Sequence, residues 1–519
     1  MSVATLWWDL ARIRGSASLD WVLALALAAM GIGVDLYKLG SVSLWGDEAF
    51  SVGLVSNSWS EMWRYVWTTE ANMALYHVVL KAWLGVTGLL GIPPVELVVR
   101  LPSVICAGLA VFVVFWTGRR FWSVTVGAIG ATLLMLNQVE LLMAREARSY
   151  SLQVLLICFG WYALLVAMSA SRHRRRWWIA YAMAMALAVY AHLFSALVVA
   201  AQVAGFGALL LLHTDWRMRA RHSLRAMALS VAAISVAIMP LVVFAALHGS
   251  SNLHVGPASL LEAAKALWNI SGHSLVYGLL LAVAASAAVL LAVRAQRRSA
   301  RESRALRGGA TAALVCWLIV PFALAYVASQ PGLNLHLFAW GYLVVVVPAL
   351  CLLAGVGVAS LRTPVARGGL ALGLLAAAAL AMPPGIFGPA QDFRSASAWI
   401  RERYSVGDGL VCTSWSCALA ADYYARIDEV PTALLDGAPA VWSWSGGGAR
   451  PLDPAALQSY AAARSRIFLV GALLDGDAPE VKSGARGAEQ WLDSRYQLID
   501  DVAVPSTLGA VRVRLYVLR

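Results

Sequence analysis

Two adjacent carboxylates, Asp47 and Glu48, are the side chains with the clearest capacity for chemistry, and they stand just after the first long apolar segment. Acids at a bilayer face are costly unless they are hydrated or paired, so a pair fixed there indicates chemistry more than packing. Successive residues do not share a face of a helix or strand, so one carboxylate can point into a site while the other holds the loop. The alternative for the pair is an ordinary solvated loop.

A second group, Arg145 and Arg148, stands about 100 residues later between apolar segments. Arginines at i and i+3 share a helix face, and guanidinium groups bind phosphate oxygens through paired hydrogen bonds. If this group and the acids lie on one side of the membrane, a carboxylate base faces an anion clamp, which suits attack on a phosphate-activated substrate. Tyr150 and Lys265 are further candidates for the phosphate. Alternatively, Glu146 pairs with an arginine in a helix cap that binds no ligand.

A divalent metal, Mg, Mn or Zn, is a further candidate, with Asp47 and Glu146 as ligands. Two or three acids do not establish such a site, and no spacing in the chain matches a zinc or P-loop motif. His192 lies between two apolar segments and is a candidate ligand for an acceptor or a sugar. A lone interfacial histidine is more often a hydrogen-bonded structural residue.

Composition places most of the chain in a membrane. Sixty per cent of the residues are hydrophobic, 13% are charged, and the mean hydropathy is +0.71, far above the values of soluble domains. A spanning helix needs about 20 apolar residues. The sequence predicts eleven such helices, near residues 19–39, 98–117, 123–141, 149–168, 177–194, 195–213, 227–247, 274–293, 309–328, 337–360 and 369–387.

The segment 74–91 decides the predicted orientation, and we interpret it as a helix lying at the membrane interface. The positive-inside rule then gives a cytoplasmic N-terminus and an extracytoplasmic C-terminus. The arginine-rich loops that face the cytoplasm lie near 119–120, 172–176, 217–225, 294–307 and 362–367. These loops account for the net charge of +12, so we expect membrane lipids and no nucleic acid as partners.

The outward loop 40–97 carries Trp59, Trp63 and Trp67 at i,i+4 spacing. This stripe predicts a second helix lying in the interface, and its commonest role is that of an aromatic anchor. We assign residues 1–387, with this loop, to the membrane domain.

After residue 385 the composition changes. Residues 388–519 hold strand-like runs near 410–412, 467–470 and 511–518 between helix-like runs such as 392–404. At about 130 residues this part is long enough to bury its own core, and we predict an extracytoplasmic α/β domain. Cys412 and Cys417 fall in it, either as a disulfide or as two thiols near a strand end. The other four cysteines lie in apolar segments, where packing is their expected role.

Several short motifs follow one another in order along the chain. They are Trp45-Gly46-Asp47-Glu48-Ala49, Leu75-Tyr76-His77 followed by Lys81, Arg100-Leu101-Pro102-Ser103, Gly118-Arg119-Arg120, the run Arg145 to Tyr150, Asp392-Phe393-Arg394 and Asp422-Tyr423-Tyr424. With them the chain resembles bacterial GT-C glycosyltransferases of the family 39-like group, which includes protein O-mannosyltransferases and lipid A aminoarabinose transferases. The resemblance covers most of the chain and is strongest over 40–165.

The resemblance implies an all-α polytopic membrane protein of the bacterial inner membrane, GT-C-like, with about 11 transmembrane helices and the C-terminal α/β domain. It implies a polyprenyl-phosphate-linked sugar donor and a glycan, lipid or protein acceptor at the outer face. Asp47, with Glu48 beside it, would be catalytic as the base that deprotonates the acceptor. Arg145 and Arg148 would hold the leaving phosphate, and the anomeric carbon would be inverted. The expected acceptor or sugar ligands are Tyr76, His77, Lys81 and His192.

Two departures from the pattern stand out. Met73-Ala74 replaces a frequent Pro-Pro pair, and Gly341-Tyr342 replaces a frequent Arg-Tyr pair, for which His336 or Lys265 could substitute. The alternative functions are a non-catalytic or transport role with a polyprenyl glycolipid, and a structural assembly role. The predicted spans carry few charged residues, which argues against transport.

Overall fold

The structure of the protein is a computed structural model. It describes residues 3–169, 173–212, 214–248, 258–297, 302–333, 335–446, 448–474 and 477–519. Parts of two arginine-rich loops, residues 172 and 298–301, lie outside the described residues.

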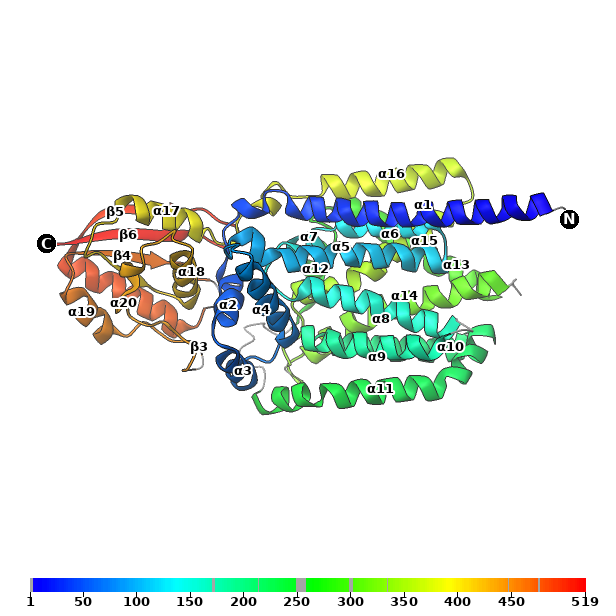
Figure 1. The fold of residues 1–519 in the computed structure, drawn as a ribbon, viewed down its shortest axis with the longest axis horizontal. Coiled ribbons are helices and arrows are strands. Elements are labelled where there is room, and N and C mark those ends of the chain that lie inside the picture. Colours follow the sequence, from blue (N-terminus) through cyan, green and yellow to red (C-terminus); the bar gives the residue numbers. More distant parts are fainter. Residues whose placement is uncertain are drawn as a thin grey trace. The chain divides into compact units, whose positions relative to one another are not determined.

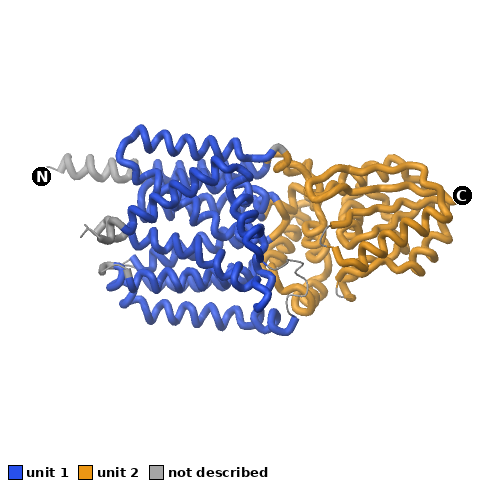
Figure 2. The backbone as a smooth tube through the Cα atoms, turned by 180° about the vertical axis from the view of Figure 1, so that it is seen from behind, with its two compact units in different colours: residues 1–36, 103–145, 149–383 blue, residues 37–102, 146–148, 384–519 orange. Residues whose placement is uncertain are grey.

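The chain forms two compact units (Figure 2). Unit 1 comprises residues 1–36, 103–145 and 149–383, and unit 2 comprises residues 37–102, 146–148 and 384–519. This division differs from the predicted boundary at 387, because the loop 37–102 and the short segment 146–148 pack with the C-terminal residues. The reason is the network of long-range contacts described below for the candidate site.

Unit 1 is helical (Figure 1). Its helices are α1 Val3–Leu36, most of α5 Glu96–Phe121, α6 Val124–Met135, α7 Gln138–Ala144, α8 Tyr150–Ser169, α9 Arg174–Ala191, α10 Ser195–Leu212, α11 Thr214–His248, α12 Leu260–Ile270, α13 Leu275–Arg297, α14 Glu302–Ala328, the 3-10 helix η2 Trp340–Val346, α15 Val347–Ala359 and α16 Pro364–Leu380.

Seven helical segments of the described residues are long and apolar enough to cross a membrane, or eight if α6 and α7 form one broken span. The seven are Ser18–Ser41, Glu96–Phe121, Tyr150–Ser169, Trp216–His248, Leu275–Val293, Arg307–Ala328 and Trp340–Ala359. The spans predicted near 177–194, 195–213 and 369–387 form helices α9, α10 and α16, which do not meet the same length and hydropathy requirement. The count of eleven therefore stays a prediction.

The surface of unit 1 is apolar. Leu19, Trp21 and Leu25 on α1, and Val236 and Met239 on α11, are each more than half exposed. In water such surfaces would associate, whereas in a bilayer they face hydrocarbon at no cost. Together with the spans, this surface identifies a multi-pass membrane protein.

Inside unit 1 the helices pack through large aromatic rings and through small residues. The indoles of Trp161 and Trp317 stack with their centroids 5.3 Å apart, and the Trp317 indole N–H donates to the Val345 carbonyl at 2.8 Å. A Cβ on Gly118 would lie 2.5 Å from the Cα of Gly127, so α5 and α6 approach as closely as glycine allows. Such close packing stabilises helix pairs in a membrane, where no hydrophobic effect drives them together.

Unit 2 combines helices with a sheet. Its elements are η1 Leu39–Ser41, α2 Gly46–Ser56, α3 Trp59–Thr68, α4 Ala74–Leu89, the start of α5, η3 Pro384–Phe387, α17 Phe393–Arg403, β1 Gly409–Cys412, α18 Trp415–Arg426, η4 Thr432–Leu435, β2 Trp442–Ser443, β3 Gly448–Ala449, α19 Pro454–Ala462, β4 Arg466–Gly471, α20 Pro479–Arg495, β5 Tyr496–Val504 and β6 Val511–Leu518. Helix α4 has 16 residues, fewer than a membrane span needs.

The main sheet has the strand order β1-β4-β6-β5. Strand β1 pairs parallel with β4, and the other neighbours pair antiparallel. The strands predicted near 410–412, 467–470 and 511–518 are present as β1, β4 and β6. Strand β5 was not predicted, because it is largely exposed and carries acids, so it lacks the apolar run that marks the others.

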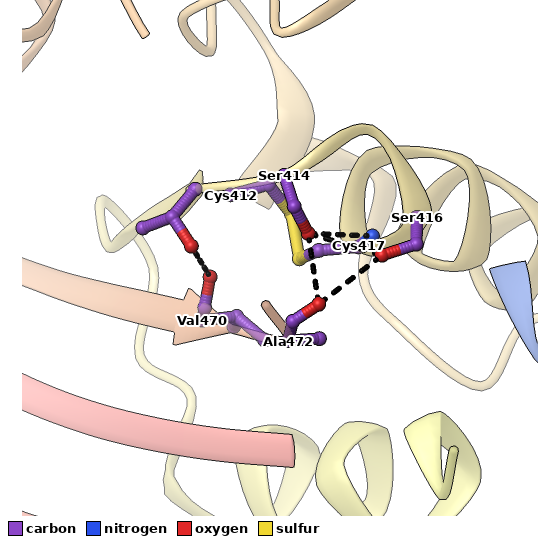
Figure 3. The surroundings of a disulfide bond; sticks show 7 residues. Cys412, Ser414, Ser416, Cys417, Val470 and Ala472 are labelled. Carbon is purple, nitrogen blue, oxygen red and sulfur yellow. Dashed lines mark hydrogen bonds between the residues drawn. A yellow bond between two sulfur atoms is a disulfide. The ribbon is translucent and has the colours of Figure 1, made fainter. Parts of the chain in front are cut away.

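A disulfide joins Cys412, the last residue of β1, to Cys417 in the first turn of α18 (Figure 3). The sequence alone did not decide between this disulfide and two free thiols. Around it, the hydroxyls of Ser414 and Ser416 both donate to the carbonyl of Ala472 at 3.4 Å, so the start of α18 is also tied to the residue that follows β4.

We expect the Cys412→Ser/Cys417→Ser double variant to lose about 2 kcal/mol of unfolding free energy, because the bond closes only a short loop. The thermal unfolding midpoint of the purified protein measures this loss. Reducing the wild-type protein should give the same shift, and an unchanged midpoint in both would contradict a stabilising disulfide.

Candidate active site

Asp47 and Glu48 lie in the first turn of α2, which begins at Gly46 after the extended residue Trp45. Carboxylates are favourable there, because the unpaired N–H groups carry partial positive charge. The two side chains differ in exposure: Glu48 is 1% exposed, and the Asp47 side chain is 30% exposed. Only Asp47 is open to a substrate.

Glu48 is held by Arg100, which lies in the part of α5 that belongs to unit 2. The guanidinium donates to both carboxylate oxygens at 2.6 Å. The Ala147 amide donates to Oε1 at 2.8 Å, and the Trp45 amide donates to Oε2 at 3.4 Å. Each oxygen of Glu48 therefore accepts two hydrogen bonds. The sequence placed Glu48 with Asp47 as a catalytic residue, and these bonds instead suit a structural role. The geometry is that of a residue that joins α2 to α5 and to the segment 146–148.

Arg100 also donates to the carbonyls of Leu39, Val42 and Ser43, at 3.1, 2.7 and 2.9 Å. Its side chain is 2% exposed. One guanidinium thus pairs a buried carboxylate and satisfies three carbonyl groups of the segment that leads into α2. This matches the rule that a buried charge is stable only when paired and fully hydrogen-bonded.

Asp47 pairs with Arg148. The distance from the Arg148 Nη2 to the Asp47 Oδ2 is 3.3 Å, and Nη1 also donates to the Asp47 carbonyl at 3.4 Å. The Arg148 side chain is 11% exposed. A partly exposed carboxylate and a largely buried guanidinium therefore lie side by side.

Two further carboxyl groups interact with this pair. Burial raises the pKa of Glu146 to about 8, with repulsion from Glu48 adding to it and Arg148 opposing it. Burial likewise raises the pKa of Glu70 to about 7, with Arg148 opposing it and Asp47 adding to it. Near neutral pH Glu146 is largely protonated and Glu70 about half protonated, so less negative charge surrounds Arg148 than if both carboxyl groups were fully ionised.

The pKa of Glu146 predicts how stability depends on pH. The ordinary value is 4.5 and the folded value about 8, so between them the folded protein holds a proton that the unfolded chain has released. The free energy of unfolding should therefore fall as pH rises from about 4.5 and level off above about 8. Glu146→Gln should flatten this dependence, as measured by unfolding midpoints from about pH 5 to 9. The exposed control Glu402→Gln should keep the wild-type slope; identical slopes in all three would contradict the shift.

His77 and Tyr76 lie in the interior of unit 2 near the start of α4, and they are 0% and 1% exposed. The His77 ring lies 6.2 Å from the Phe50 ring and 6.5 Å from the Tyr76 ring. Within the described residues neither ring nitrogen of His77 has a hydrogen-bond partner. Burial, helped by Arg148, lowers its pKa to about 3, so the ring is neutral. Both residues were expected to bind acceptor or sugar, and the structure gives them no surface for it.

Lys81 contributes to packing around the end of α2. Its ammonium donates to the carbonyls of Val55 and Asn57 at 2.8 and 2.5 Å, and it lies 5.0 Å from the centroid of the Trp59 ring. A cation at a helix C-terminus satisfies the unpaired carbonyls there. This residue, also expected to bind acceptor or sugar, is engaged in holding α2 and α3 together.

The remaining predicted residues lie in unit 1. Arg145 is buried and donates to the Asp35 carbonyl at 2.6 Å. The rings of Tyr150 and His192 lie 5.7 Å apart, and His192 lies 4.7 Å from Tyr342, so these three form one aromatic cluster. The structure thus brings Tyr150 and His192 together, although the sequence assigned them to different ligands.

Lys265 lies on α12 of unit 1 and pairs with Glu262 at 2.8 Å, with both side chains about half exposed. They line a cavity of about 360 Å³ together with Trp268, Asn269 and Trp340. The ammonium is neutralised by its own neighbour, which weakens the case for Lys265 as a phosphate ligand.

Among the described residues, no group of three or more His, Cys, Asp and Glu side chains is arranged to hold a metal ion. The Mg, Mn or Zn site considered from the sequence, with Asp47 and Glu146 as ligands, stays a prediction, and no step below depends on a metal.

Two residues important to this region, Arg100 and Glu70, were not among the predicted site residues. Both stood out only weakly: Arg100 as one of the few cations in the outward segments, and Glu70 as an acid in the same loop as Asp47. Their partners are distant in sequence, so only the folded chain identifies them.

Comparison with protein-family models and with curated protein sequences finds no match. Solved structures do match. ArnT from Cupriavidus metallidurans in the apo state has 13% identity and a TM-score of 0.58, covering 96% of this chain and 98% of that one. The same protein bound to undecaprenyl phosphate has 13% identity and a TM-score of 0.53, covering 95% and 98%. The apo oligosaccharyltransferase from Archaeoglobus fulgidus has 11% identity and a TM-score of 0.50, covering 94% and 74%. At these identities the likeness is one of fold.

Proposed function

The chain has the GT-C fold, and from this premise we propose that it is an inverting glycosyltransferase of the cytoplasmic membrane. It moves a sugar from a polyprenyl-phosphate-linked donor to an acceptor hydroxyl at the outer face. The observation that carries the proposal is the pair of Asp47 and Arg148 within 3.3 Å, one a carboxylate and the other a guanidinium. The attacking hydroxyl needs a base, and the leaving phosphate needs positive charge.

In the proposed reaction Asp47 takes the proton of the acceptor hydroxyl while its oxygen attacks the anomeric carbon. The bond from that carbon to the phosphate oxygen breaks, and the phosphate leaves with both electrons of the bond. Arg148 stabilises the charge that develops on this oxygen. Because attack and departure occur on opposite faces in one displacement, the configuration at the carbon inverts.

Two further features support the proposal. ArnT, whose fold the chain shares, is bound to undecaprenyl phosphate in one structure, and we extend that class of ligand to this chain. The raised pKa values of Glu146 and Glu70 reduce the negative charge around Arg148 near neutral pH, which favours an anion beside it. We propose Glu48 as a positioning residue, and we keep Arg145 and Tyr150 as proposed phosphate ligands.

Undecaprenyl phosphate tests the phosphate site directly. At about 100 times its dissociation constant it should stabilise the wild-type protein by roughly 2.7 kcal/mol. Arg148→Ala should abolish most of this stabilisation, and the exposed arginine variant Arg64→Ala should keep it. A ligand-induced shift of the thermal midpoint measures each value. An Arg148→Ala protein that responds like the wild type would exclude Arg148 from the site.

A transfer assay then separates catalysis from binding alone. A panel of polyprenyl-phosphate monosaccharides is offered with octyl glycosides as acceptors, and released polyprenyl phosphate is measured. The anomeric configuration of the product reports inversion or retention. Stabilisation by undecaprenyl phosphate without release from any donor would favour the glycolipid-binding or transport alternative.

A further inference from the structure

We propose that Tyr424 is a positioning residue for the base: from the C-terminal part of the chain it fixes residues 43–46, and through them Asp47. This inference rests on the proposed function, which assigns Asp47 as the general base. All the residues concerned belong to unit 2. The C-terminal region therefore takes part in assembling the site, a role that the sequence left open.

The Tyr424 hydroxyl forms three hydrogen bonds. It lies 3.0 Å from the hydroxyl of Ser43, it accepts from the Leu44 amide at 3.2 Å, and it donates to the Glu96 carboxylate at 3.2 Å. Tyr424 is 0% exposed, and the Glu96 side chain is 3% exposed. A single buried phenol thus links the segment before α2 to the start of α5, the helix that also carries Arg100.

Neighbouring C-terminal residues hold the same segment. Gln391 accepts from the Gly46 amide at 3.1 Å, and the Arg394 amide donates to the Ser43 hydroxyl at 3.1 Å. A Cβ on Gly46 would lie 2.5 Å from the Cβ of Ser416, so α2 begins in direct contact with α18. Asp47 is the next residue, so its backbone position is set by these contacts.

Helix α18 is itself anchored at both ends. At its start the disulfide and the hydroxyls of Ser414 and Ser416 tie it to β1 and to Ala472 (Figure 3). Near its end the hydroxyl of Tyr423 donates to the Pro94 carbonyl at 2.9 Å. A rigid helix can therefore transmit the position of the C-terminal sheet to the residues before Asp47.

Tyr424→Phe removes one oxygen and keeps the ring. It leaves the buried Leu44 amide without its partner and removes one of two contacts of the Glu96 carboxylate, which keeps its ion pair with Arg394. Buried polar groups without partners favour local opening. A base displaced by about 1 Å can lose on the order of 100-fold in rate, so we expect turnover to fall about 10- to 100-fold. The affinity for undecaprenyl phosphate should stay within about twofold, because Tyr424 contacts neither Arg148 nor Asp47.

The experiment compares the full-length wild type, Tyr424→Phe and the matched control Tyr460→Phe. The control removes another buried phenol, whose hydrogen bonds go to Leu410 and Leu434 and not to residues 43–46. Amide hydrogen exchange of the segment 43–50 is measured first, followed by undecaprenyl phosphate binding and turnover with the donor panel. We expect exchange about tenfold faster or more in Tyr424→Phe only, with reduced turnover and retained binding. Wild-type exchange in Tyr424→Phe, or faster exchange with undiminished turnover, would overturn the inference.

The exchange measurement does not depend on enzyme activity. If the wild-type protein releases no polyprenyl phosphate from any donor, the proposed function fails on that result. Faster exchange confined to Tyr424→Phe would then still establish that Tyr424 holds the segment, and unchanged exchange would refute it. Gln391→Ala, which removes the acceptor of the Gly46 amide, provides a second and milder variant should Tyr424→Phe fold poorly.

Discussion

Asp47→Asn is expected to reduce sugar transfer by about 10²- to 10⁴-fold, the usual contribution of a general base. Asparagine has nearly the same size and can still accept a hydrogen bond from Arg148, but its amide oxygen does not take up the proton of an acceptor hydroxyl. The Asp47 side chain is 30% exposed, so the lost ion pair should cost less than about 1 kcal/mol of stability. Transfer is measured with the donor panel, and folding is checked by the unfolding midpoint.

The matched control is Glu61→Gln, which neutralises an exposed acid of α3 in the same outward loop. It should transfer at the wild-type rate. The asparagine variant should still bind undecaprenyl phosphate, because Arg148 remains in place. Transfer by Asp47→Asn at the wild-type rate would remove Asp47 from the role of base, whatever the variant does to binding.

Arg100→Ala should have the largest effect on stability, a loss of roughly 3–5 kcal/mol, because breaking a buried ion pair leaves an uncompensated charge. The variant loses five hydrogen bonds at once, two to Glu48 and three to the carbonyls that precede α2. We expect a strongly lowered unfolding midpoint and faster amide exchange in the segment 39–50.

Two controls test the cause of this loss. Arg426→Ala breaks the half-exposed pair with Asp422 on α18 and should change stability by less than about 1 kcal/mol. Glu48→Leu combined with Arg100→Met replaces both charges by apolar groups and should recover part of the loss. If Arg100→Ala were as stable as Arg426→Ala, the Glu48–Arg100 pair would not hold α2 in place.

The sequence determined the class of the protein and many of its elements. Apolar runs of about 20 residues are local signals, so most of the membrane helices follow from hydropathy alone. The strand-like runs near 410–412, 467–470 and 511–518 likewise predicted three strands of the sheet. The ordered short motifs predicted the GT-C fold, and the solved structures confirm that fold. Asp47 was singled out because acids at a bilayer face are costly unless hydrated or paired, and Arg148 because it stands with Arg145 between apolar segments.

Only the tertiary structure decided which of the two acids is open. Asp47 and Glu48 are equivalent in the sequence, but Glu48 finds Arg100 after 52 residues and the Ala147 amide after 99. Folding therefore buries one carboxylate and leaves the other accessible. His77 and Lys81 were expected at a substrate surface because the sequence does not show how α2, α3 and α4 pack. That packing decides the burial and the partners of both residues.

One long-range feature is the hydrogen bond between Ser43 and Tyr424, which are 381 residues apart. Periodicity and composition describe each segment by itself, and they predicted a separate C-terminal domain. Hydrogen bonds between distant segments instead join residues 37–102 and 146–148 to that domain. The sequence by itself thus determined that the chain is a membrane protein and which residue types could act, because these depend on local hydrophobicity and charge. The partner of each charged group, and so which of the two acids is accessible, was decided by the tertiary structure, because such pairing depends on side chains that only folding brings within hydrogen-bonding distance.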